Sequence, residues 1–259
     1  MSDEVFQRYS DYYDLLYRDK NYAAEADYVA RTLRAVAPAA RSVLEFGSGT
    51  GRHGRLLAQH GFRVFGVERS ESMVQAAGRA QAAPRQDGTG SFDCINGDIR
   101  RLALNRSYDA VIALFHVVSY QTTNDDVQSL FASAARHLGP SGVFFFDVWH
   151  GPAVLHEHPS VRVKRVEDDT RRLTRVAEPE LDTNASVVTV RYTMMAESKT
   201  DGQHATFQET HRMRYFFPQE VALLAGHAGF QVEHAEEFLS ARTPSEATWG
   251  VAYVLRKTN

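Results

Sequence analysis

The sequence predicts a doubly wound α/β fold with an antiparallel β-sheet inserted after the fifth strand. Short apolar runs alternate with helix-compatible segments up to about residue 150, a glycine cluster follows the first run, and the residues beyond Gly151 form strands with no helix between them. Strands that alternate with helices favour a parallel sheet covered on both faces. The length of 259 residues fits one such domain plus an elaboration.

The first elements form a β-α-β unit. Apolar residues at helical spacing predict a helix over Ala23–Ala37, which Pro38 ends. A short apolar run at Val43–Phe46 predicts the first strand, and the glycine cluster and a helical segment lead from it to a second strand at Val64–Glu68. The next elements repeat this pattern: a helix starting at Ser70, strands at Phe92–Ile95 and Tyr108–Leu114, a helix over Asp125–Leu138, a turn at Gly139–Gly142 and a strand at Val143–Asp147.

The predicted insertion consists of β-branched and aromatic-rich runs at Val161–Val166, Leu173–Val176, Val187–Met195 and Thr206–Phe216. A helix from Pro218 to Ala228 and strands at Phe230–Phe238 and Trp249–Leu255 then complete a seven-stranded main sheet. We therefore expect an N-terminal helical lid over residues 1–36, an α/β domain over 37–150 and 215–259, and the inserted sheet over 151–214.

Composition and charge exclude several classes of protein. Lys and Arg number 29 and Asp and Glu 32, so the net charge of −3 offers no basic surface for nucleic acid. The longest apolar stretches fall short of the roughly 20 residues that a membrane span needs, and the polar, acidic start does not resemble a signal peptide. Cys94 is the single cysteine, which forms no internal disulfide and is compatible with a cytoplasmic protein.

Gly47, Gly49 and Gly51 alternate at the first strand-to-helix turn, where a residue without a β-carbon lets a ligand approach the backbone. Two ligand classes use such turns. A dinucleotide site is one alternative, because Gly49, Gly51 and Gly54 fit its spacing and Glu68 follows at the expected distance. Against it, Glu45 precedes the cluster, where a carboxylate would repel a pyrophosphate and suits a cationic ligand.

The run from Glu45 to Gly51 resembles the first motif of the class I S-adenosylmethionine (SAM) dependent methyltransferases. The resemblance implies a Rossmann-like methyltransferase sheet with SAM as cofactor. It also implies that Glu68 accepts from the ribose hydroxyls, Met73 packs on the adenine, Asp98 and the Ile99 backbone bind the adenine edge, and Phe115 lies under the methyl group. The cofactor-binding residues expected are thus Tyr13, Glu45, Gly47, Gly49, Glu68, Met73, Asp98, Ile99 and Phe115.

Methyl transfer is one in-line displacement, so alignment of the reactants dominates and a base helps only where the acceptor must lose a proton. The loops after the fourth and fifth strands offer three catalytic candidates, His116, Tyr120 and His150. His53, His60 and His137 lie on predicted helices and are expected at the surface. No histidines have the spacing of a metal site, so no metal is predicted.

Tyr9, Tyr13 and Tyr17 fall on one face of a short helix, which is typical of packing or of a lid over the cofactor. Tyr13-Asp14 and the insertion are similar to the N,N-dimethyltransferases of deoxy amino-sugar biosynthesis. That similarity implies a small polar acceptor, an amino or deoxy sugar linked to a nucleotide. A small-molecule O-methyltransferase, a nicotinamide-dependent oxidoreductase and a non-catalytic SAM-binding protein are the alternatives.

Strand alternation in the last run of the insertion places Glu209, His211 and Met213 on one face and Arg212 and Arg214 on the other. An arginine that faces the cleft would bind the diphosphate of a nucleotide sugar. A solvated face or a homodimer contact is the other interpretation of these residues.

Overall fold

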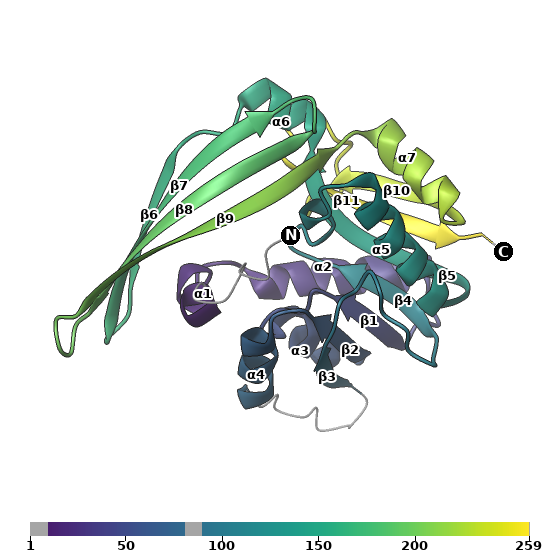
Figure 1. Ribbon diagram of the computed structural model, residues 1–259. Helices are drawn as coiled ribbons and strands as arrows, with labels where there is room; N and C mark the ends of the chain where they lie inside the picture. The colour runs from purple at the N-terminus through teal and green to yellow at the C-terminus, as the bar shows by residue number, and fades with distance from the viewer. Residues whose placement is uncertain (1–9, 81–89, 259) are drawn as a thin grey trace.

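The computed structural model describes residues 10–80 and 90–258, which form an α/β body and a long, curved arm of antiparallel strands (Figure 1). In the body, the first five strands pair in parallel, and the strand that follows them in the sheet runs antiparallel to its neighbours. Across the sheet the order is β3 (Ser91–Asn96), β2 (Arg63–Glu68), β1 (Ser42–Phe46), β4 (Tyr108–Ala113), β5 (Leu138–His150), β11 (Gly250–Lys257) and β10 (Phe230–Glu237). This arrangement confirms the predicted fold class.

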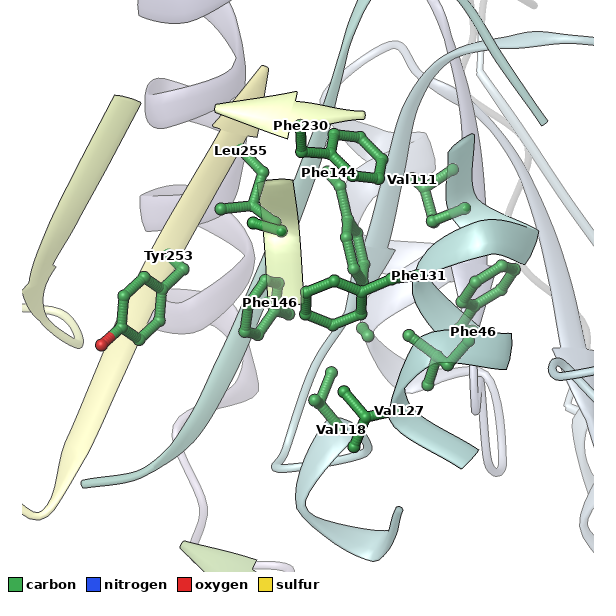
Figure 2. Packing of buried hydrophobic residues seen from close by; sticks show 14 of the residues in the cluster. Phe46, Val111, Val118, Val127, Phe131, Phe144, Phe146, Phe230, Tyr253 and Leu255 are labelled. Carbon is green, nitrogen blue, oxygen red and sulfur yellow. The ribbon is translucent and has the colours of Figure 1, made fainter. Parts of the chain in front are cut away.

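Helices cover both faces of this sheet because its strands are apolar on both sides. On one face, α2 (Tyr22–Val36) and α3 (Arg52–Gln59) pack on residues such as Ile112 and Phe145. On the other, α5 (Asn124–His137) and α7 (Pro218–His227) pack on an aromatic cluster that includes Phe144 and Phe146 (Figure 2). The helix α4 (Glu71–Arg79) lies beside β2 and β3. The carboxyl ends of the parallel strands therefore form one open edge between the layers.

The arm consists of four antiparallel strands, β6 (Arg162–Glu167), β7 (Arg171–Asp182), β8 (Val187–Ser198) and β9 (His204–Phe216). The place where the arm joins the body follows from the different lengths of β4 and β5. β4 pairs with β5 only as far as Phe146, and β9 pairs in parallel with β5 at Trp149 and His150. β11 pairs with the other edge of β5. β9 therefore pairs with the same edge of β5 as β4 does, beyond the last residue that pairs with β4.

A short helix, α1 (Ser10–Leu16), lies between the arm and the body (Figure 1). Leu15 and Leu16 pack with Leu173 and Met194 of the arm. Tyr9, which was expected on the same helical face as Tyr13, lies outside the described residues. In the described part of the chain, no helix has the length and apolar composition needed to cross a membrane.

The observed elements differ from the expected ones in three places. The turn at Gly139–Gly142 lies within β5, where it forms an irregularity in the pairing with β4 between Tyr108 and Ala110. β7 extends beyond the expected end at Val176 to Asp182, since antiparallel pairing with β8 continues past Pro179. An additional helix, α6 (Gly151–Glu157), precedes the arm and has Pro152 in its first turn, but it is too short to leave a periodic signal.

Two of the three histidines expected at the surface are buried. The Nε2 atom of His53 lies 2.7 Å from Glu25 Oε2 inside the α2–α3 contact. His137 is fully buried, and its Nε2 accepts from the backbone N–H of Leu104 at 3.0 Å. The surface prediction was wrong for both, because each polar nitrogen has a partner that sequence periodicity does not reveal.

Candidate functional site

A cavity of about 1090 Å³ opens at the carboxyl ends of the parallel strands and continues under the arm. Its floor is the glycine turn after β1, and one side consists of the end of β2 and the start of α4. α1 and the inner face of the arm form the opposite side. Ten predicted site residues line it: Tyr13, Gly47, Gly49, Glu68, Met73, Asp98, Ile99, Phe115, His116 and Tyr120.

The glycine turn has left-handed backbone torsions that side chains other than glycine rarely adopt. The φ angles are 67° at Gly47, 53° at Gly49 and 75° at Gly51. A β-carbon at Gly47 would lie 2.5 Å from Val117 Cγ2, whereas one at Gly49 would meet only Met73 Sδ, at 3.9 Å. The turn thus packs tightly against the β4 loop at Gly47 and leaves its surface open at Gly49.

Glu68 ends β2 with its carboxylate held by the backbone on both sides. Oε2 accepts from the Gly49 N–H at 3.0 Å and Oε1 from the Ser70 N–H at 2.8 Å. Burial raises the pKa of Glu68, and these N–H groups oppose that shift by stabilising the charged form. Each carboxylate oxygen keeps a further acceptor position, so the group is fixed in orientation and still able to accept from a ligand.

Glu45 does not reach the cavity. Its side chain is 1% exposed, and a β-carbon at Gly54 would lie 2.7 Å from its Oε2, so the carboxyl group lies beneath the turn toward α3. Burial raises the pKa of Glu45 to about 8, with the Arg55 guanidinium opposing the shift. The expectation of a negative charge facing the ligand was therefore wrong, because the group lies under the turn and is mostly protonated at neutral pH.

Replacing Glu45 by glutamine is expected to stabilise the protein above about pH 8. A carboxyl group whose pKa rises from 4.5 unfolded to about 8 folded contributes stability below pH 4.5 that is lost as the pH rises to about 8. A neutral amide does not have this loss. Urea unfolding at several pH values should show E45Q gaining on the natural protein between these limits, and parallel pH curves would contradict the raised pKa.

Asp98 is bound by a neighbouring arginine. Both of its oxygens accept from Arg100, with Nη2 to Oδ2 at 2.6 Å, and this bond lowers the pKa of Asp98. Arg100 Nη1 also contacts Asp126 Oδ1 at 2.6 Å. Asp98 and Arg100 therefore form the far end of the cavity as one charged unit, beside the backbone of Ile99 and the buried side chain of Met73.

The loop after β4 carries two consecutive residues in the left-handed region, Phe115 at φ 64° and His116 at φ 63°. Asp147, buried three residues before the end of β5, stabilises this conformation: its Oδ2 accepts from the His116 backbone N–H at 3.1 Å and lies 2.6 Å from the His116 Nδ1. His116 also lowers the pKa of Asp147 against the effect of burial. The ring of Phe115 lies edge-on to Tyr17 at 5.1 Å, which closes the cavity on that side.

Tyr120 connects the β4 loop to the arm. Its hydroxyl lies 2.9 Å from His211 Nδ1, and His211 Nε2 lies 3.3 Å from Glu209 Oε2. His211 lines the cavity with Tyr120. The alternation of the sequence correctly placed Glu209 and His211 on one strand face, but their meeting with Tyr120 depends on how the arm folds back over the body.

His150 lies outside the cavity, which makes its predicted catalytic role wrong. It is 3% exposed, and its Nδ1 has no hydrogen-bond partner among the described residues. Side chains alternate along a strand, and the preceding Trp149 is the one that lines the cavity. Burial lowers the pKa of His150, which keeps the ring neutral.

Arg52 was not predicted, although it directly follows the glycine cluster. Its guanidinium lies over the Tyr22 ring at 4.8 Å, and its Nε lies 3.4 Å from Asp14 Oδ1. Thr50 Oγ1 donates to the same carboxylate at 3.2 Å. These contacts hold α1 over the turn and bring a cation to the cavity, a group that suits a ligand carboxylate.

Residues 43–142 match the protein family described as a methyltransferase domain. A dTDP-3-amino-3,4,6-trideoxy-alpha-D-glucopyranose N,N-dimethyltransferase of Streptomyces venezuelae is 31% identical over 90% of this chain and 94% of its own length. A dTDP-4-amino-2,3,4,6-tetradeoxy-D-glucose N,N-dimethyltransferase of Saccharopolyspora spinosa is 28% identical over 87% and 86% of the two chains.

Solved structures agree with these matches. The crystal structure of DesVI from Streptomyces venezuelae superposes with a TM-score of 0.79 at 27% identity, covering 97% of this chain and 98% of that one. The sugar N-methyltransferase KedS8 of Streptoalloteichus superposes with a TM-score of 0.78 at 26% identity, covering 95% and 93%. These likenesses decide between the two interpretations of the glycine cluster, and the chain belongs to the class I SAM-dependent methyltransferases, enzymes whose cofactor is SAM.

Proposed function

We propose that this enzyme transfers methyl groups to the amino group of a nucleotide-linked amino sugar. One observation carries the proposal: the inner face of the arm and the SAM crevice line the same cavity, so an acceptor bound under the arm reaches the methyl group. The names of the relatives, dTDP-amino-sugar N,N-dimethyltransferases, support this class of acceptor.

The residues of the crevice suit SAM. The open surface at Gly49 admits a ligand to the backbone, and the fixed carboxylate of Glu68 has acceptor positions for two ribose hydroxyls. Arg52 suits the carboxylate of the methionine portion. When bound, SAM supplies an electrophilic methyl group on a sulfonium, and the protein has to align the acceptor nitrogen and exclude water. Tyr13, Tyr17 and Phe115 form the aromatic cover for that purpose.

Arginines of the arm suit the diphosphate of the acceptor. Arg162, Arg175 and Arg212 all line the cavity. Arg175 lies over the Tyr192 ring at 4.9 Å and donates to the Tyr17 hydroxyl at 3.2 Å, which holds its guanidinium inside. Arg214, the other predicted candidate, instead donates to Asn124 Oδ1 at 2.7 Å and pairs with Glu220, so it joins β9 to α5 and α7.

A panel of acceptors tests the proposal. With SAM, we expect methylated products by mass from dTDP-linked 3-amino and 4-amino deoxy sugars, and little or none from the same sugars without the nucleotide, since they lack the diphosphate. Matched sugars with a hydroxyl in place of the amine test the O-methyltransferase alternative. Methylation of the hydroxyl sugars alone would overturn the proposal.

A cytoplasmic location and a homodimer stay predictions from the sequence.

A further inference from the structure

Tyr120, His211 and Glu209 form a hydrogen-bonded chain from the cavity into the arm. The Tyr120 hydroxyl and His211 Nδ1 lie 2.9 Å apart, and His211 Nε2 and Glu209 Oε2 lie 3.3 Å apart. Glu209 is 9% exposed and His211 3% exposed, so the inner end of the chain is shielded from water. Tyr192 packs edge-on against the His211 ring at 4.9 Å and fixes its plane.

The order of the partners determines what the imidazole can do. Because a carboxylate oxygen only accepts, the contact between His211 Nε2 and Glu209 Oε2 places a proton on Nε2, which donates to Glu209. Nδ1 is then an acceptor, and the Tyr120 hydroxyl donates to it. A phenol that gives its proton to a base can take up another proton on the same oxygen.

We propose that this chain removes the proton that an acceptor ammonium group must lose before its nitrogen can attack the methyl group. The inference rests on the proposed amino-sugar function. The proton leaves the substrate nitrogen for the Tyr120 oxygen as the Tyr120 proton moves to His211 Nδ1. The amine then has its lone pair free, Tyr120 is again neutral, and the imidazolium is stabilised by Glu209. In this scheme Tyr120 is the catalytic residue, and His211 and Glu209 are positioning residues that act through it.

The surroundings of Tyr120 favour a relay over a stable phenolate. Burial raises the pKa of its hydroxyl, and the titratable groups that face it, Tyr192, Tyr17, Glu209 and Glu68, act in the same direction. Tyr13, from α1, is also close enough to interact electrostatically. A negative charge on Tyr120 is therefore costly, and accepting one proton while releasing another avoids it.

His116, another histidine that lines the cavity, is less suited to this role. Asp147 accepts from the backbone N–H of His116 as well as lying against its ring, so this pair stabilises the left-handed loop. His116 and Asp147 also border a second cavity of about 390 Å³ behind the loop, together with Lys20. Tyr120, in contrast, lies between the SAM crevice and the arm that we propose receives the acceptor.

The pH dependence of methyl transfer tests the relay. In Y120F and H211Q we expect kcat near neutral pH to fall about 100-fold, the size typical for loss of a positioned base. The gap should close toward about pH 10, where solvent deprotonates an ordinary alkyl amine. Acceptor KM and SAM affinity should stay within about threefold of those of the natural enzyme. In H211Q the glutamine side chain still accepts the hydrogen bond from Tyr120 but cannot take up its proton. E209Q should show a smaller loss in the same direction.

H137Q is the matched control, because His137 is a buried histidine outside the cavity. It is expected to lower stability and keep the natural pH profile. An H211Q profile that superimposes on the natural one overturns the relay, and so does a shift of the profile in H116Q alone.

Failure of the relay can be told apart from failure of the proposed function. If the natural enzyme methylates no amino sugar of the panel, the proposed function fails, and nitrogen NMR of His211 in the resting enzyme still decides the relay. A neutral ring with its proton on Nε2 supports it. A ring protonated on Nδ1, which could not receive the Tyr120 proton, overturns it.

Discussion

Replacing Glu68 by alanine is expected to weaken SAM binding at least about 100-fold. The carboxylate has acceptor positions for two ribose hydroxyls, and each hydrogen bond to a charged group contributes about 1.5–3 kcal/mol. Two such bonds correspond to at least about two powers of ten in the dissociation constant. Isothermal titration with SAM and with S-adenosylhomocysteine measures the loss directly.

Glu45 provides the control for this prediction. Glu68 is the last residue of β2 and Glu45 the last but one of β1, but Glu45 lies beneath the turn and mostly carries its proton at neutral pH. E45Q should therefore bind SAM as the natural enzyme does. Because Glu68 also accepts from the Gly49 and Ser70 backbone, E68Q serves as a second variant that keeps the side-chain volume. Unchanged SAM affinity in both Glu68 variants would show that the ribose does not bind there.

The sequence predicted the sheet because its strands are continuous apolar runs between helices with clear periodicity. It also predicted that Glu68 lines the cavity, because an acid that ends the second strand lies at the open edge of the sheet whatever the details of packing. It wrongly placed the Glu45 carboxyl group in the cavity. The side of a strand on which such a group lies depends on the space that neighbouring side chains leave. Gly54 is the one local signal, since its missing β-carbon leaves room for the Glu45 carboxyl.

The acceptor side was harder to predict for a topological reason. Tyr120 and His211 are 91 residues apart in the sequence. Their contact exists only because β9 pairs with the edge of β5 beyond Phe146, where the pairing between β4 and β5 stops. The alternation of side chains along the strand gave the correct face for His211, but it did not indicate that Tyr120 is its partner. His150 shows the same limit, since it lies one residue beyond Trp149 and so on the opposite side of the strand.

Replacing Gly47 by alanine is expected to destabilise the protein by about 2–5 kcal/mol and to weaken SAM binding strongly. The new β-carbon would lie 2.5 Å from Val117 Cγ2 at a φ of 67°, so it adds overpacking, at about 1–3 kcal/mol, to backbone strain, at about 1–2 kcal/mol. Urea unfolding and SAM titration measure the two effects. G78A is the control, because a β-carbon there meets no atom within 4 Å in the exposed part of α4, and it should leave the protein as stable or more so.

The double variant G47A/V117A separates the two costs. Shortening Val117 removes both γ-carbons that the new β-carbon would meet, at 2.5 and 3.0 Å, so the overpacking cost should be largely recovered. The left-handed torsion is unchanged, and that part of the loss should remain. Val117 follows the two left-handed residues Phe115 and His116, so the contact with Gly47 joins the floor of the SAM crevice to the loop that leads to Tyr120. A recovery of stability without a recovery of SAM affinity would show that the crevice depends on the torsion of Gly47, whereas equal effects of G47A and G78A would contradict the tight contact itself.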